Sequence, residues 1–161
     1  MALGIKLSAA EDSAEVVAFR CAAFGEERDK TLKEVQRHMR AGKVFVARRR
    51  GKVIATICLT PKKPWAIDAS YFTPVRTALY LLGMAVAPPL QRKGIGRRCL
   101  LEADHIALNW PAQAIRLDAY DCRSGAGPFY QGGGYREVGR AVYRQMPLIY
   151  YEKLITPTNA A

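Results

Sequence analysis

Residues 91–98, which read Gln-Arg-Lys-Gly-Ile-Gly-Arg-Arg, combine two glycines with four cationic side chains. Glycine lets the backbone adopt unusual dihedral angles and come close to a ligand. A helical pattern follows, and the first amides of a helix lack internal partners while the helix dipole adds positive potential there. This stretch therefore predicts an anion site, for which phosphate is the common ligand. The alternative interpretation is a basic, glycine-rich turn that binds nothing.

Two predicted elements hold this turn in place. Residues 79–87 are apolar and uncharged, which predicts a strand covered on both faces. Pro88 and Pro89 end the strand, because proline cannot donate to a sheet ladder. Residues 95–109 then repeat apolar side chains at helical spacing, and Pro111 ends that helix.

The motif Gln91-x-x-Gly94-x-Gly96 resembles the (Arg/Gln)-x-x-Gly-x-(Gly/Ala) motif of the GCN5-related N-acetyltransferase (GNAT) superfamily. Val86-Ala87-Pro88 resembles the Val-x-Pro that usually precedes it. In that family the loop binds the pyrophosphate of coenzyme A. The resemblance therefore implies that the cofactor contacts come from Gln91, Arg92, Lys93, Gly94, Ile95, Gly96 and Arg97. No Gly-Lys-Ser/Thr follows, as a P-loop requires, and Cys99 breaks the GxGxxG of dinucleotide folds.

A second resemblance covers residues 126–135. Family members often carry Asn-x-x-Ala-x-x-(aromatic/Leu)-Tyr-x-x-x-Gly-(Phe/Tyr) in this part of the chain. The matching residues here are Ala126, Phe129, Tyr130, Gly134 and Tyr135. The Asn position holds Arg123, with Ser124 beside it, so the resemblance implies that these two residues face the cofactor arm with altered chemistry. The glycine run at 132–134 predicts a short helix.

Tyr130 occupies the position of the frequent general acid of the family. When an amine expels a thiolate, a phenol within reach of the sulfur can protonate it. An ordinary phenol pKa of about 10 keeps the group protonated at neutral pH. The alternative is a core tyrosine whose hydroxyl binds a backbone group.

The family holds the thioester arm with free backbone amides at the end of the central strand, an oxyanion-type contact. By position, the resemblance assigns this role to Met84, Ala85 and Val86. Many relatives also place a glutamate base on this strand, but residues 79–87 contain no carboxylate. Carboxylates elsewhere are candidates, none of which we assign as catalytic: Glu26, Glu27, Asp29, Asp68, Asp118 and Asp121.

The sequence offers little support for other chemistry. His38 and His105 are the only histidines, they lie far apart, and Cys122 is near the predicted site. A Cys–His nucleophile pair or a two-histidine metal site has no local motif behind it, so we expect no metal.

The remaining patterns predict the order of the other elements. A short strand is expected at residues 5–7, and capping boxes at residues 8–11 and 31–34 predict helices that end at Gly25 and Gly42. A hairpin is expected at residues 43–59, a strand at 114–121, and a final pair of strands that turns near Gly139 and Arg140. This order predicts an α/β protein with a GNAT-like mixed central β-sheet flanked by about four helices.

The loop at 61–77 contains Trp65, Tyr71 and Phe72, more aromatic bulk than a loop usually needs. These side chains either cover the sheet edge or form a rim that binds the acceptor, and the sequence does not separate the two readings.

Length and composition restrict the class of protein. At 161 residues and 50% hydrophobic content, residues 1–161 are expected to form one domain. No apolar run reaches the roughly 18 residues that span a bilayer. The first residues of the sequence include several acidic side chains and show no secretory signal pattern. The four cysteines form no CxxC pair. We therefore expect a reduced, cytoplasmic protein. The net charge of +11 favours anionic partners in general.

The sequence therefore predicts an acetyl-coenzyme A-dependent N-acetyltransferase in which an amine attacks the thioester directly. The acceptor is a small-molecule or peptide amine, and the resemblance implies a homodimer. One alternative is a basic nucleic-acid-binding module, supported by the charge and by clusters such as residues 48–50, although no nucleic-acid motif appears. Another alternative is a relative that binds coenzyme A without transferring an acetyl group.

Overall fold

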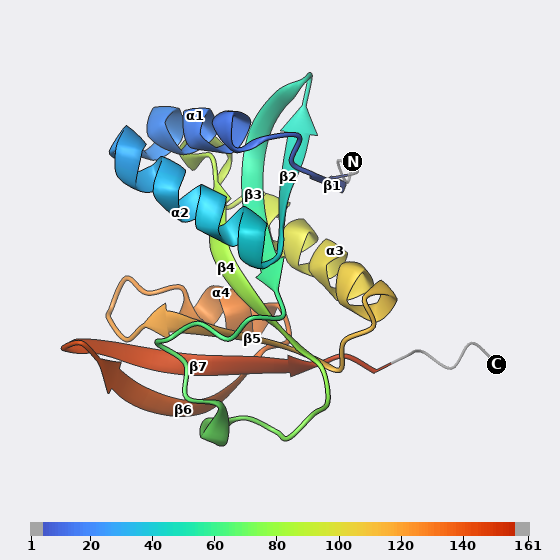
Figure 1. Cartoon of the computed structure of the whole chain (residues 1–161), viewed down its shortest axis with the longest axis vertical. Coiled ribbons are helices and arrows are strands. Elements are labelled where there is room, and N and C mark those ends of the chain that lie inside the picture. The colour runs from blue at the N-terminus through green and yellow to red at the C-terminus, as the bar shows by residue number, and fades with distance from the viewer. Residues whose placement is uncertain (1–4, 157–161) are drawn as a thin grey trace. The chain divides into compact units, whose positions relative to one another are not determined.

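A computed structural model describes residues 5–156 and contains, within that range, seven strands and four α-helices. The strands form one mixed sheet in the order β1-β2-β3-β4-β5-β7-β6 (Figure 1). The chain divides into two compact units, Met1–Thr60 with Leu81–Glu102 and Pro61–Tyr80 with Ala103–Ala161. The expected α/β class with a mixed sheet and four helices is therefore confirmed, and each unit is described separately below.

The first unit begins with a strand, two helices and a hairpin. Its elements are β1 (Leu7–Ala9), α1 (Ser13–Phe24), α2 (Arg28–Ala41), β2 (Lys43–Arg49) and β3 (Lys52–Thr60). Both helices lie against the β2–β3 hairpin (Figure 1). Val17 of α1, Val35 of α2 and Val46 of β2 are buried in the core between these layers. The predicted hairpin is confirmed, with Gly51 in its turn at a φ of 77°.

The predicted helix starts were both wrong. Helix α1 begins at Ser13, where Asp12 accepts a hydrogen bond from the Glu15 amide, so the box at residues 8–11 caps nothing. Helix α2 begins at Arg28 under a cap from Glu27, three residues before the predicted box. In both cases an acidic side chain directly before the first helical residue, Asp12 or Glu27, caps the orphan amides. The predicted ends at Gly25 and Gly42 are confirmed.

The central strand β4 (Ala78–Val86) runs from the second unit into the first. Leu79, Tyr80 and Leu81 are buried, as expected. From Leu82 onward, however, every residue of the strand is half-buried or exposed, so the prediction of cover on both faces holds only for the first half. Helix α3 (Ile95–Asn109) has the predicted bounds.

The second unit contains the aromatic loop and the last strands. Its other elements are η1 (Ala69–Tyr71), β5 (Ala114–Tyr120), α4 (Gly127–Gly132), β6 (Arg136–Tyr143) and β7 (Met146–Leu154). Phe72 and Ile67 of the loop pack with Tyr150 of β7, so part of the loop does cover the sheet. Trp65 is 88% exposed and Tyr71 is 43% exposed, so these two aromatics remain on the surface.

A buried ion pair ties this loop to the sheet. Arg116 on β5 pairs with Glu152 on β7 at 3.3 Å, and both side chains are almost fully buried. The same guanidinium donates to the Thr73 carbonyl at 2.6 Å and to the Tyr80 hydroxyl at 3.0 Å. The Thr73 amide in turn donates to Glu152. Each buried charge is thus satisfied, as burial requires.

The last predicted turn was also wrong. Strands β6 and β7 meet at Arg144 and Gln145, which both have positive φ angles, and not at residues 139–140. Gly139 instead lies within β6 at a register shift, where an added Cβ would collide with the ring of Tyr71. The glycine there serves close packing.

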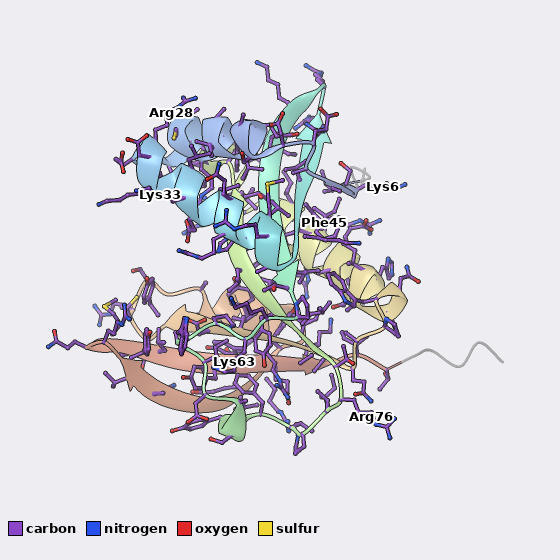
Figure 2. The ribbon with its side chains drawn as sticks, viewed as in Figure 1. Lys6, Arg28, Lys33, Phe45, Lys63 and Arg76 are labelled. Atoms are coloured by element: carbon purple, nitrogen blue, oxygen red, sulfur yellow. The ribbon has the colours of Figure 1, made fainter. Side chains whose placement is uncertain are left out.

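The surface accounts for much of the positive charge. Lys6, Arg28, Lys33 and Arg76 are exposed; Arg28 and Lys33 both lie on α2, whereas Lys6 precedes β1 and Arg76 lies in the loop before β4 (Figure 2). Within residues 5–156, no helix is long and apolar enough to cross a membrane. In the same range, no group of three or more His, Cys, Asp or Glu side chains is arranged to hold a metal ion.

Candidate active site

The turn after β4 has the backbone of an anion site. A short 3-10 helix, η2 (Pro88–Leu90), follows the strand, and Gly94 then precedes α3 at a φ of 82°. An added Cβ at Gly94 would meet nothing within 4 Å, so the glycine is required by its left-handed backbone and by nothing that packs on it. The space over this residue is open.

The first amides of α3 have no intrahelical partner. The first helical hydrogen bond runs from the Arg98 amide to the Gly94 carbonyl at 3.0 Å. The Ile95 and Gly96 amides therefore precede any intrahelical bond, as at other helix starts. Gly96 itself has no positive φ, so the expectation of unusual dihedrals at both glycines is wrong for Gly96.

One side chain of this turn makes a hydrogen bond within the protein, and four others are exposed cations. The Gln91 side-chain amide donates to the Val86 carbonyl at 3.0 Å, which ties the turn to the end of β4. Arg92 has a φ of 61° and, like Lys93, Arg97 and Arg98, is exposed. Four cations around unpartnered amides create the positive potential that a pyrophosphate group requires. The residues present therefore fit coenzyme A.

The strand that leads into this turn contains an irregularity at Gly83. This residue lies in the middle of β4 with a φ of 58°, and it is exposed. Met84, Ala85 and Val86 follow it and are half-buried. The three residues assigned to the thioester arm thus lie in the open half of the strand, directly after a glycine that the backbone requires.

The second unit contains the other predicted site residues. Tyr130 lies on the six-residue helix α4 and is 8% exposed. The rings of Phe129, Tyr135 and Tyr151 surround it at centroid distances of 5.1, 5.8 and 6.2 Å. Burial, together with the negative charge of Asp118, raises the pKa of Tyr130 to about 12. Its hydroxyl makes no hydrogen bond to another described residue, so it does not behave as a core tyrosine bound to the backbone.

Glycines set the shape of this helix. An added Cβ at Gly127 would collide with the Tyr151 hydroxyl, and Gly134 has a φ of 92°. The short helix predicted from the glycine run is confirmed. Arg123 and Ser124, in the loop before it, are exposed, and the Ser124 hydroxyl lies 3.8 Å from the Cys122 sulfur.

Most of the candidate base carboxylates are already engaged. Glu26 pairs with Arg20, and Asp121 pairs with Arg140. Glu27 and Asp68 accept hydrogen bonds from backbone amides at helix starts. Asp118 is the exception among these: it is half-buried, has no cationic partner among the described residues, and burial raises its pKa. Asp29 is exposed.

The mixed sheet, together with a positively charged, glycine-containing turn between its central strand and a helix, is the arrangement expected of an acyl-coenzyme A-dependent transferase. The chain belongs to the Acetyltransferase (GNAT) family, whose sequence model matches residues 13–135. It is therefore an N-acetyltransferase, with acetyl-coenzyme A as co-substrate and an amine as acceptor.

Solved structures agree with this fold. An aminoglycoside 6'-N-acetyltransferase complexed with coenzyme A is 17% identical, with a TM-score of 0.74 over 94% of this chain and 97% of that chain. A Bacillus subtilis acetyltransferase in complex with CoA is 14% identical, with a TM-score of 0.71 over 94% and 99%. The ribosomal-protein-S18-alanine N-acetyltransferase from Escherichia coli is 17% identical, with a TM-score of 0.70 over 97% of both chains. No curated protein matches the sequence.

Proposed function

We propose that the residues 91–97 bind the pyrophosphate of acetyl-coenzyme A, and that the amides of Met84, Ala85 and Val86 bind its thioester arm. The observation that carries the proposal is the backbone at Gly94: a left-handed glycine under open space, followed by helix amides without internal partners. A purely structural turn has no need of an open, positively charged surface at this point.

We further propose that Tyr130 protonates the leaving thiolate. A general acid must hold its proton until the sulfur leaves, and the raised pKa of Tyr130 keeps the phenol protonated at neutral pH. Bound acetyl-coenzyme A supplies an activated acyl group. The chain supplies the amides that polarise the carbonyl and the phenol that delivers a proton. Arg123 and Ser124 are proposed as contacts to the cofactor arm.

The acceptor class is a small-molecule or peptide amine. The neighbours in fold include enzymes named for an aminoglycoside and for a protein alanine, and at 17% identity neither name transfers to this chain. A screen of amines with thiol release as the readout identifies the acceptor. A cytoplasmic location, a homodimer and a single domain over residues 1–161 stay predictions.

Calorimetry with acetyl-coenzyme A tests the cofactor site. Wild type is expected to bind with a micromolar Kd, and Gly94→Glu is expected to lose binding because the new carboxylate repels phosphate. Gly51→Glu is a matched control, since Gly51 also has a left-handed φ and open space around it, but lies in the β2–β3 turn. Equal binding by wild type and Gly94→Glu would remove the cofactor from this turn.

A further inference from the structure

Helix α2 brings one of the two histidines to the irregular point of β4. A Cβ added at Gly83 would lie 3.7 Å from both Cε1 and Nδ1 of His38. Because Gly83 has no side chain and is exposed, this edge of the imidazole faces uncovered backbone. The next residue is Met84, whose Cα is only about 3.8 Å further along the chain. The ring thus lies beside the strand segment assigned above to the thioester arm.

The surroundings of His38 are those of a reactive group. The residue is 9% exposed, and its imidazole makes no hydrogen bond or ion pair with any described residue. Its backbone carbonyl, in contrast, accepts hydrogen bonds from the Gly42 amide and the Cys58 thiol. The backbone is therefore fixed while both ring nitrogens remain available. A purely structural buried histidine normally finds a partner for its ring.

Burial, more than the charges around the ring, favours the neutral form of His38. Burial lowers the pKa of His38, Glu34 on the same helix opposes that effect, and Arg37 and Arg20 add to it. Arg20 on α1 is itself held by Glu26 and Glu34 at 2.7 Å. Cys58 on β3 is a thiol whose pKa burial raises to about 12, and Gly83 on β4 adds no charge. At neutral pH the imidazole is therefore unprotonated and can accept a proton.

We infer that His38 is the general base of the transfer and accepts a proton from the ammonium group of the acceptor. The inference rests on the proposed function. Strand β4 contains no carboxylate that could act as the base. The imidazole of His38 on α2 lies next to Gly83 of this strand and fills that role in the proposal.

The proton balance of the step is simple. The acceptor R–NH3+ gives one proton to a nitrogen of His38, and the free amine attacks the thioester carbon. The C–S bond breaks as the C–N bond forms, the sulfur takes a proton from Tyr130, and the phenolate takes the second proton from the new amide nitrogen. His38 releases its proton to solvent, so one proton leaves per turnover.

Imidazole NMR on the intact protein tests the placement without an acceptor. The chain has two histidines, and His105→Gln, at an exposed position on α3, assigns the two signals. Acetyl-coenzyme A is expected to shift the His38 signal and to leave that of His105 unchanged. Binding of acetyl-coenzyme A by calorimetry with an unshifted His38 signal overturns the inference. No calorimetric binding would instead refute the proposed cofactor site, which keeps the two failures distinct.

Kinetics test the role. Ethanolamine is protonated at neutral pH and needs a base, whereas hydroxylamine is already unprotonated. We expect His38→Gln to lower kcat/KM for ethanolamine about 100-fold and to leave hydroxylamine within a few-fold, with unchanged acetyl-coenzyme A binding. In His38→Gln, the decrease of kcat/KM for ethanolamine at acidic pH that is due to protonation of His38 should also disappear. Equal losses for both amines, or an acidic limb that survives in His38→Gln and disappears in Asp118→Asn, contradict the role.

Discussion

At the scale of single residues, the site uses burial to fix protonation states. Tyr130 and His38 are both largely buried, and in each case burial favours the neutral form. For the phenol this secures a proton to donate, and for the imidazole it secures a lone pair that accepts one. Burial thus favours the proton-donating form of Tyr130 and the proton-accepting form of His38.

Tyr130→Phe tests the acid. We expect kcat to fall about 100-fold with the acceptor found in the screen, while the Kd for acetyl-coenzyme A stays unchanged. Wild-type activity should show no alkaline loss from this phenol below its pKa of about 12. Tyr135→Phe is the matched control, because the Tyr135 hydroxyl is buried without a partner and its removal leaves nothing unsatisfied. Equal effects of the two changes on kcat would count against the acid role.

His38 also makes stability depend on pH. Its pKa is lowered in the folded protein, so between the folded and unfolded pKa values the unfolded chain binds more protons. The free energy of unfolding therefore rises with pH through this window. The contribution of His38 is fully present above the unfolded pKa of about 6.5, and it is lost as the pH falls through the folded pKa. Urea unfolding from pH 5 to 8 should show a smaller acid loss in His38→Gln than in His105→Gln. Identical slopes would show that His38 titrates normally.

At the scale of elements, the loop at 61–77 is held by charge as well as by apolar packing. Glu152 is 2% exposed, forms an ion pair with Arg116 and accepts a hydrogen bond from the Thr73 amide. Glu152→Gln should lower the free energy of unfolding by about 3 kcal/mol, because it leaves the Arg116 charge buried without its carboxylate. Glu137→Gln breaks the exposed pair with Arg140 and should cost less than about 1 kcal/mol. Urea unfolding measures both, and similar losses would refute the buried network.

The elements also show what the sequence could predict. Long periodic segments were found at their true bounds, as with α3 at Ile95–Asn109, because helical spacing and Pro111 act locally. The helix starts predicted from residues 8–11 and 31–34 were wrong, because several acidic and hydroxyl side chains near each start match the pattern of a cap and the sequence does not select among them. The predicted position of the β6–β7 turn was wrong because Arg144 and Gln145 adopt a left-handed backbone there without any glycine.

The candidate site divides in the same way. The turn at residues 91–97 and Tyr130 could be proposed from the sequence, since each belongs to a local motif with fixed spacing. His38 could not be proposed in this way, because its proximity to Gly83 is set by the packing of α2 on the sheet, and the 44 intervening positions leave no spacing to recognise. The only local signal was a glycine within an apolar strand, which often marks a bulge or a close approach.

At the scale of the whole molecule, a net charge of +11 means that many anions will bind to some extent. Nucleic acid and free phosphate would therefore stabilise the protein weakly and without specificity, and the effect should vanish with salt because exposed charges are screened. A specific co-substrate must stabilise the protein beyond that background.

Thermal unfolding separates the two effects. At about 100 times its Kd, acetyl-coenzyme A should add about 2.7 kcal/mol to stability, which for a chain of this length raises Tm by roughly 5–10 °C. ATP at the same concentration offers phosphates and adenine without the thioester arm, and should give a smaller shift that disappears in 0.5 M salt, at a screening length of roughly 4 Å. If residues 1–161 form one domain, a single transition should move as a whole, and Gly94→Glu should abolish the specific part of the shift. Equal shifts with the two ligands would assign the basic turn to anions in general, and a melt in which only part of the transition moves would show that the two compact units unfold separately.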